Sequence, residues 1–156
     1  MVHKAIALAQ PGDVIVVDAG GDLTNAIIGE LMLAQMVKRG LAGIVIHGAI
    51  RDSGAIAKQG FPVYAAGVTH RGPYKDGPGE INVAIALDGM VIEPGDLVVG
   101  DEDGLLCVPF DATDAVLAAT EAKQAAEQTQ IAAIEAGTHS APWVDEALRR
   151  LGCEGL

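Results

Sequence analysis

The chain has 156 residues, of which 50% are hydrophobic and 3% aromatic, and its formal net charge is −11. The high apolar fraction excludes a disordered chain. The excess of Asp and Glu excludes a general attraction to nucleic acid or to anionic membranes. This length suits one domain, whose core must be built from Val, Ile, Leu and Ala.

Neither a membrane span nor an export signal is predicted. The most apolar stretch, residues 26–37, is interrupted by Glu30, and it falls short of the roughly 20 residues that a spanning helix needs. The N-terminal residues do not form the apolar segment and cleavage site of a signal peptide. Cys107 and Cys153 follow no disulfide or metal spacing, which is typical of a reducing compartment. We therefore expect a cytoplasmic protein without nucleic-acid or membrane partners.

Strand and helix signals alternate in the first half of the chain, which predicts βαβ units and a parallel sheet. Short β-branched runs predict buried strands over residues 13–18, 41–46 and 61–65. A helical stretch between the first two strands has Lys38 and Arg39 in its last turn and Gly40 after it. A short helix is predicted over residues 53–59.

The second half begins with a loop rich in Gly and Pro over residues 67–80, and short strands are predicted over residues 81–87, 90–92, 97–99 and 105–108. The turn signals between these strands favour antiparallel pairs or a small barrel-like unit. The tripeptide Pro-Gly-Asp precedes strands at residues 11–13 and 94–96, so we predict the same turn at both places. Residues 101–104 lack the spacing of a calcium loop and are interpreted as a tight turn.

The last part of the chain is helical in pattern. Asp111 is a candidate N-cap, an alanine-rich helix is predicted to reach Gly137, and a short helix follows over residues 142–151. Apolar residues leave a stripe on the long helix, at Val116, Leu117, Ile131 and Ile134. We predict a domain over residues 1–137, a helical tail over residues 138–156, and an oligomer in which the stripe packs on a neighbouring subunit.

Common cofactor and nucleophile motifs do not occur in the sequence. The four histidines are scattered, no P-loop or dinucleotide fingerprint is found, and Ser53 has no His–acid partnership. The candidates that remain follow the first two predicted strands, where open α/β sheets usually place ligands.

Gly29 is the first candidate, because a glycine inside a helix costs roughly 1 kcal/mol relative to alanine. If the helix begins just after Gly29, the free amides of Glu30, Leu31 and Met32 can bind a small carboxylate, favoured by the helix dipole. Alternatively, Gly29 only permits close packing of the helix on a strand. The spacing alone leaves both interpretations open.

Arg51 and Asp52 are the second candidate and follow residues 47–50 directly after the second predicted strand. A guanidinium can bind a carboxylate or an enolate oxygen through two hydrogen bonds, and a carboxylate can hold a hard divalent cation. In the alternative interpretation, Arg51 is a surface residue and Asp52 caps the helix that begins at Ser53.

The two candidates together, Gly29-Glu30 and Arg51-Asp52 with 20 residues between them, resemble the RraA-like family. The resemblance runs from about residue 11 to residue 137, and its motifs lie at residues 12–21, 40–52, 61–63, 72–82 and 94–104. It implies an α/β fold, a swivelling β/β/α sandwich with a mixed sheet and a C-terminal helical extension. It also implies a homotrimer or hexamer with active sites between subunits.

The metal-dependent members of the family are class II aldolases, and the resemblance implies roles for individual residues. The carboxylate of the substrate would be bound by the backbone amides of Gly29, Glu30, Leu31 and Met32. Arg51 would bind the 2-oxo acid and stabilise its enolate. Asp52 would ligate Mg²⁺ or Mn²⁺, and Glu30 would hold a water molecule on the metal.

Two further positions follow from the resemblance. A glutamate from the C-terminal helix of the adjacent subunit completes the site in relatives, and Glu127 is the matching residue, with Glu121 as the alternative. His47 stands where relatives commonly carry aspartate.

The implied reaction is cleavage of 4-hydroxy-4-methyl-2-oxoglutarate, or of 4-carboxy-4-hydroxy-2-oxoadipate, with release of pyruvate. Oxaloacetate decarboxylation is an expected companion activity, because it produces the same enolate. A divalent cation and Arg51 would offset the enolate charge without a Schiff-base lysine.

Two other functions are hypotheses from the same resemblance. One branch of the family is a non-catalytic regulator that inhibits a ribonuclease E-type endonuclease. That branch departs from the Arg-Asp pair and lacks the long C-terminal helix, whereas both are found or predicted in this chain. Relatives also carry a further N-terminal segment before the part that matches residues 9–13, so an inactive shortened relative is the third hypothesis.

Overall fold

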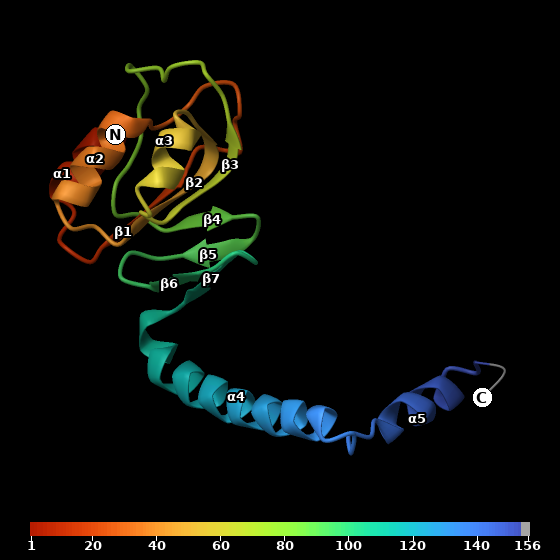
Figure 1. The fold of residues 1–156 in the computed structure, drawn as a ribbon. Coiled ribbons are helices and arrows are strands. Elements are labelled where there is room, and N and C mark those ends of the chain that lie inside the picture. The colour runs from red at the N-terminus through yellow and green to blue at the C-terminus, as the bar shows by residue number, and fades with distance from the viewer. Residues whose placement is uncertain (154–156) are drawn as a thin grey trace. The chain divides into compact units, whose positions relative to one another are not determined.

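Three parallel strands form the sheet that positions the candidate site (Figure 1). They are β1 (Val14–Asp18), β2 (Gly43–Ile50) and β3 (Val63–Val68), in the order β1-β2-β3. The computed structural model describes residues 1–153. The first of its two compact units is Met1–Phe110, and the second begins at Asp111. Because β1 pairs with β2 and β2 pairs with β3 in parallel, the predicted parallel sheet is confirmed.

Strand β2 is longer than predicted, because it continues through residues 47–50 to Ile50. His47 pairs with Asp18 of β1, and Ile50 pairs with Val68 of β3 after a register shift. The end predicted for this strand, residue 46, was therefore wrong. The glycine and alanine of residues 47–50 lack strong strand propensity, and pairing with segments distant in the sequence makes these residues a strand.

The core lies on both faces of β2, since successive side chains of a strand point to opposite faces. Helices α1 (Val2–Leu8), α2 (Glu30–Lys38) and α3 (Ser53–Lys58) pack with the first face. The fully buried large side chains of this cluster are Ile6, Ile28, Leu33, Met36, Ile44 and Ile46. On the second face Val45 packs with Leu87 and Ile92 of the first hairpin that follows.

Two antiparallel hairpins complete the first unit, as predicted. The first joins β4 (Ile85–Leu87) to β5 (Met90–Ile92), and the second joins β6 (Leu97–Gly100) to β7 (Leu105–Val108). Strand β4 is shorter than the strand predicted over residues 81–87, because Asn82 adopts a left-handed backbone with φ 58°. A left-handed residue interrupts the extended chain that a strand requires.

The two Pro-Gly-Asp motifs form the same turn, which confirms the prediction. Asp13 Oδ2 accepts a hydrogen bond from the Gln10 amide at 2.8 Å, and Asp96 Oδ2 accepts one from the Glu93 amide at 2.9 Å. In both motifs the glycine has positive φ, 92° and 102°, which glycine adopts without steric cost. A local sequence signal therefore specifies each of the turns that lead into β1 and β6.

Asp96 makes contacts that Asp13 lacks. Its Oδ1 accepts a hydrogen bond from the Phe110 amide at 3.1 Å, and its Oδ2 lies 3.5 Å from Cys107 Sγ. The Glu93 amide is the main cause that lowers the pKa of Asp96 below its ordinary value of 3.8, with help from the Phe110 amide and the Cys107 thiol. Burial, followed by Asp96, raises the pKa of the Cys107 thiol, which keeps it a poor nucleophile near neutral pH.

We expect Asp96→Ala to lower the thermal unfolding midpoint more than Asp13→Ala, because only Asp96 ties its turn to the end of the second hairpin. A carboxyl with a lowered folded-state pKa stabilises the fold above its unfolded pKa, and this contribution is lost as the pH falls through the folded value. The difference between wild type and Asp96→Ala should therefore be full at pH 7 and shrink below about pH 3.8. Melting curves by circular dichroism measure both effects, and an equal or larger loss in Asp13→Ala contradicts the assignment.

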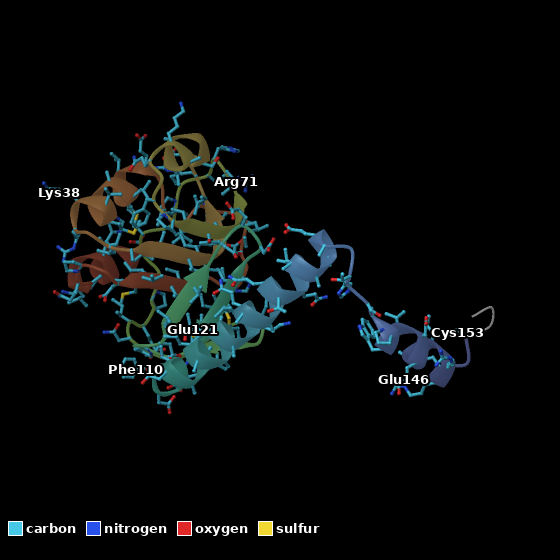
Figure 2. All side chains as sticks on the ribbon, turned by 60° about the horizontal axis from the view of Figure 1, so that its bottom comes forward. Lys38, Arg71, Phe110, Glu121, Glu146 and Cys153 are labelled. Carbon is cyan, nitrogen blue, oxygen red and sulfur yellow. The ribbon has the colours of Figure 1, made fainter. Side chains whose placement is uncertain are left out.

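The second unit is helical, with α4 (Thr113–Glu135) and α5 (Pro142–Arg150). The stripe residues of α4 are exposed, and side chains project from all sides of both helices (Figure 2). Ala112 is the N-cap of α4 and Asp111 lies in a 3₁₀ turn, so the predicted Asp111 cap was wrong. The boundary between compact units falls before α4, whereas the domain predicted from the sequence extends to residue 137.

No helix within residues 1–153 combines the length and the apolarity that crossing a bilayer requires.

Candidate active site

Before α2 begins, the chain after β1 runs parallel to the end of β2 and brings the two candidate segments together. The Ile27 amide donates to the Ala49 carbonyl at 2.8 Å, and the Arg51 amide donates to the Ile28 carbonyl at 3.0 Å. Ala26 and Ala49 also form a parallel bridge. This short ladder ends at Gly29, next to Arg51.

Gly29 is the N-cap of α2, so the helix begins at Glu30 and the glycine lies outside it. A Cβ atom at Gly29 would lie 2.5 Å from Asp52 Oδ2 and 2.8 Å from Arg51 Nε. Real Cβ atoms do not approach other atoms so closely, so a side chain here would displace both functional groups. The close contact is with the Arg-Asp pair, which favours the site interpretation of Gly29 over simple packing of helix on strand.

The Asp52 carboxylate binds the N-terminus of α2 and makes no hydrogen bond to the N-terminus of α3, the helix that Asp52 precedes. Its Oδ2 accepts a hydrogen bond from the Glu30 amide at 3.1 Å, and its side chain makes no capping bond to α3. Asp52 thus stands at the N-cap of α3, as the alternative interpretation expects, but its side chain makes no capping bond there. Asp52 has a left-handed backbone with φ 58°, a conformation that aspartate tolerates better than most residues and that occurs often at functional sites.

Arg51 lies beside Asp52 with few polar restraints on its side chain. Its Nε lies 3.6 Å from Asp52 Oδ2, within ion-pair range but beyond a hydrogen bond. That Nε is buried and has no hydrogen-bond partner among the described residues, although 41% of the side chain is exposed. A buried donor without a partner is costly. The exposed part of the Arg51 side chain is the part that an anion can reach.

The first turn of α2 has amides that no helix carbonyl can reach. The Glu30 amide is used by Asp52, which leaves the Leu31 and Met32 amides for an anion. The Glu30 side chain is exposed, Leu31 is 78% exposed, and Met32 is buried. The structure thus places Glu30 and Asp52 at one helix end.

Glu127 belongs to the second unit and lies on α4. Its Oε1 is 3.0 Å from Lys123 Nζ, an exposed pair one helical turn apart. Its expected place in the site of an adjacent subunit stays a prediction.

The donors for a metal ion are few. Within residues 1–153 no group of three or more His, Cys, Asp or Glu side chains could hold a metal. Mg²⁺ is commonly bound by one or two carboxylates together with water and substrate oxygens. Asp52 and Glu30 fit that pattern, whereas a site that encloses the ion in protein ligands does not exist in this part of the chain.

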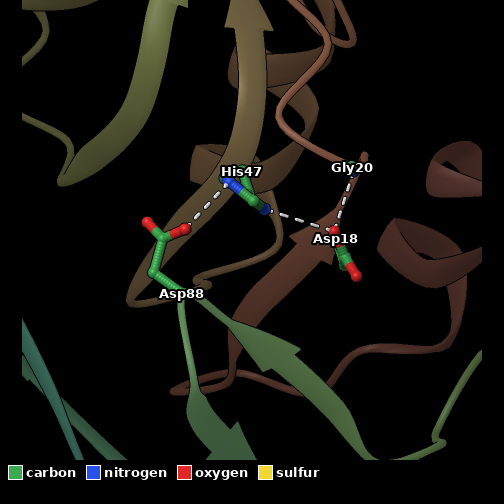
Figure 3. Close-up of polar contacts among 4 residues, drawn as sticks. All are labelled: Asp18, Gly20, His47 and Asp88. Carbon is green, nitrogen blue, oxygen red and sulfur yellow. Dashed lines mark hydrogen bonds and ion pairs between the residues drawn. The ribbon is translucent and has the colours of Figure 1, made fainter.

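His47 of β2 contacts Asp18 at the end of β1 and Asp88 in the turn between β4 and β5 (Figure 3). Its Nδ1 lies 3.3 Å from Asp18 Oδ1 and its Nε2 lies 3.7 Å from Asp88 Oδ1. The Gly20 amide fixes Asp18 through a hydrogen bond of 2.8 Å. Sequence reasoning missed this cluster, because its members lie far apart in the chain and share no motif.

A groove of about 1040 Å³ runs beside β1, lined by α1, β1 and residues 73–83 among others. Arg51 and Asp52 do not line it.

Solved structures of known proteins share this fold. The chain is similar to RraAS2 of Streptomyces coelicolor, described as an unusual member of the RNase ES inhibitor RraA protein family, with a TM-score of 0.75 and 32% identity over 83% of this chain and 67% of that one. It is similar to the RNA-processing inhibitor RraA from Thermus thermophilus, with a TM-score of 0.66 and 34% identity over 69% and 66%. These neighbours confirm the α/β fold that the resemblance implied.

Similar sequences give the same family. A protein of Halalkalibacterium halodurans, named provisionally as a 4-hydroxy-4-methyl-2-oxoglutarate aldolase, is 44% identical over 85% of this chain. A 4-hydroxy-4-methyl-2-oxoglutarate aldolase of Thermus thermophilus is 34% identical over 70% of this chain. The matches span 63% and 66% of the length of these two relatives. The RraA-like family model, Aldolase/RraA, matches residues 1–107, and the chain therefore belongs to the RraA-like family.

Proposed function

We propose that this protein is a metal-dependent aldolase that cleaves 4-hydroxy-4-methyl-2-oxoglutarate, or 4-carboxy-4-hydroxy-2-oxoadipate, and releases pyruvate. One observation carries the proposal: Gly29 leaves room for Arg51 and Asp52 to meet at the N-terminus of α2. A cationic fork, a carboxylate and free amides at one helix end suit a small 2-oxo acid. The names of the two relatives support the same activity. Oxaloacetate decarboxylation is proposed as a companion reaction.

Asp52 and Glu30 are the residues that would hold Mg²⁺ or Mn²⁺. When bound, such a cation supplies Lewis-acid stabilisation of negative charge on substrate oxygens. The hydrogen bond from the Glu30 amide keeps the Asp52 carboxylate at the end of α2. Because this bond uses only Oδ2, the other oxygen of Asp52 has capacity left as a ligand.

Arg51 binds the 2-oxo acid and stabilises the enolate that forms when the bond between C3 and C4 breaks. Its guanidinium carries several donors in a planar fork, and its Nε has no partner among the described residues. The Leu31 and Met32 amides bind the substrate carboxylate at the positive end of the α2 dipole. Arg51 and these amides would thus stabilise the negative charge on the substrate oxygens without having to rearrange.

A base must take the proton of the C4 hydroxyl, which becomes the carbonyl of the second product, and the enolate must gain a proton to give pyruvate. We assign the base to a carboxylate, Glu30 or Glu127 of a neighbouring subunit. A homotrimer or hexamer would supply Glu127. Exposed apolar side chains on α4 and on the two hairpins support such an assembly. They are Val116, Leu117, Ile131 and Ile134 of α4, and Val91, Leu97, Val99 and Leu106 of the hairpins. A cytoplasmic location is part of the proposal.

A regulator of an RNA-degrading endonuclease is the second candidate function. The similarity to the Thermus thermophilus RNA-processing inhibitor and to RraAS2 supports it. Binding of a protein partner does not require an Arg-Asp pair at a helix N-terminus, so the local geometry favours the enzyme.

A coupled assay of pyruvate release tests the proposal. Purified protein is supplied with oxaloacetate or 4-hydroxy-4-methyl-2-oxoglutarate, once with Mg²⁺ and once with a chelator. We expect pyruvate from both substrates only with Mg²⁺. Protein that is folded by circular dichroism but forms no pyruvate, and that binds a ribonuclease E-type endonuclease tightly, would support the regulator instead.

A further inference from the structure

We propose that His47 is a pH-sensitive latch, which ties the first hairpin to the parallel sheet when its imidazole ring is charged. The latch consists of His47 on β2, Asp18 at the end of β1 and Asp88 in the turn between β4 and β5 (Figure 3). It is independent of the proposed aldolase function, because it concerns the docking of the hairpin and is measured without substrate.

The turn after β1 fixes the position of His47. The His47 carbonyl accepts hydrogen bonds from the amides of Ala19 at 3.2 Å and Gly21 at 3.0 Å. Its ring Nδ1 lies 3.3 Å from Asp18 Oδ1, an oxygen that the Gly20 amide already holds at 2.8 Å. A Cβ atom at Gly21 would lie 3.2 Å from His47 Nε2, so the backbone of this glycine lies tightly against the ring.

The first hairpin brings Asp88 to the other ring nitrogen. Asp88 and Gly89 form the two-residue turn between the paired residues Leu87 and Met90, with φ values of 47° and 90°. Positive φ at both central residues is typical of the hairpin turn that favours Asp-Gly. Asp88 Oδ1 lies 3.7 Å from His47 Nε2, within ion-pair range. The ring is only 25% exposed, whereas the Asp88 side chain is 93% exposed.

This arrangement suits the charged ring better than the neutral one. A neutral imidazole has one N–H group, whereas the charged ring has two. Because each ring nitrogen faces a carboxylate oxygen, the neutral ring must present a lone pair to one of them. The charged ring can donate to both Asp18 and Asp88. Histidine ordinarily changes its charge between pH 5 and 8, so we expect the latch to close at the acidic end of this range.

Neighbouring charged groups do not replace the ring as a partner. Asp22, the next acidic residue of the turn after β1, accepts hydrogen bonds within that turn. Strand β3 has no acidic or basic residue, and its Tyr64 hydroxyl donates to a backbone carbonyl of the second hairpin. Within residues 1–153 no lysine or arginine forms an ion pair with Asp18 or Asp88. The charge on His47 therefore decides whether these carboxylates have a cationic partner.

The latch holds the turn of the hairpin, while apolar contacts hold its strands. Leu87 and Ile92 pack against Val45 of β2, and this contact does not depend on pH. Folding gives the charged ring two carboxylate partners, so linkage places the stabilisation below the range in which histidine titrates. The stabilisation is lost as the pH rises through that range. Because Asp88 is exposed, the effect on stability is small.

Asp88→Asn tests the latch, because asparagine keeps the size of the side chain, tolerates a left-handed backbone and removes the charge. We expect the thermal unfolding midpoint to fall by about 1–4 °C at pH 5.5 and to change by less than about 1 °C at pH 8.5. Asp103→Asn is the matched control in the turn of the second hairpin. Its effect should be the same at both pH values.

His47→Gln identifies the group that titrates. In this background Asp88→Asn should change the midpoint equally at pH 5.5 and 8.5, as a double-mutant cycle measures. His70→Gln is the control, since His70 is exposed and forms no ion pair within residues 1–153. It should leave the pH dependence of the Asp88→Asn effect unchanged.

A measurement on the wild-type protein covers the case in which His47→Gln does not fold. Nuclear magnetic resonance should show the Gly89 amide shifting with pH at the same midpoint as the His47 ring, whereas the Gly104 amide of the second hairpin should not follow it.

Three results would overturn the latch. They are an equal effect of Asp88→Asn at the two pH values, an unchanged pH dependence of this effect in folded His47→Gln protein, and a Gly89 amide that does not follow the His47 ring. Pyruvate release is not measured in these experiments, so their failure leaves the aldolase proposal standing, and a failure of the aldolase assay leaves the latch standing.

Discussion

Replacement of Asp52 by asparagine is expected to reduce metal-dependent pyruvate release by about 100-fold or more while the fold stays intact. The carboxylate is the charged ligand in the proposed site, and an amide binds a hard divalent cation far more weakly. The amide oxygen can still accept the hydrogen bond from the Glu30 amide, so the local structure should be kept. Steady-state kinetics and thermal melting curves measure the two parts of this prediction.

Asp103→Asn is the control for the charge change, since Asp103 lies in the exposed turn between β6 and β7. It should keep wild-type kinetics. Wild-type activity of the Asp52→Asn protein in the presence of a chelator would contradict the metal role of Asp52.

Gly29→Ala is expected to lower kcat/KM about 10- to 100-fold. A Cβ at this position would lie 2.5 Å from Asp52 Oδ2 and 2.8 Å from Arg51 Nε, so both groups must move. Misplacement of catalytic groups by about 1 Å can cost a factor of about 100 in rate. The free energy of unfolding should change by less than about 1 kcal/mol, because alanine at an N-cap is only moderately unfavourable.

Gly54→Ala is the matched control, because a Cβ at Gly54 meets no atom within 4 Å. This residue lies in helix α3, where alanine raises stability by up to about 1 kcal/mol. Its kinetics should equal those of wild type. If both alanine variants are equally active, the close approach at Gly29 has no functional meaning.

Local signals predicted the parts of the fold that local physics determines. The parallel strands follow from short β-branched runs, and the two Pro-Gly-Asp turns follow from proline, a glycine with positive φ and an aspartate that accepts the amide three residues before it. The position of Gly29 outside α2 was one of two interpretations that the sequence left open. The structure places Gly29 at the N-cap of α2, and the contacts that a side chain would make there favour the interpretation as a site.

Features that depend on distant segments could not be predicted in the same way. Residues 47–50 continue β2 because residues 18, 26, 67 and 68 pair with them or with their neighbours. The Asp52 side chain turns toward α2 because a free amide at Glu30 competes successfully with capping of α3. The hydrogen bond from Asn25 to Gly72 spans 47 residues, so no local pattern specifies it.

Binding of Mn²⁺ tests most directly whether Asp52 holds a divalent cation beside Arg51. Free Mn²⁺ is followed by electron paramagnetic resonance while the metal is titrated into wild-type, Asp52→Asn and Asp103→Asn proteins. We predict one site per chain in wild type and in Asp103→Asn, and at least about a tenfold loss of affinity in Asp52→Asn. Equal Mn²⁺ binding by the wild-type and Asp52→Asn proteins would contradict the proposed site.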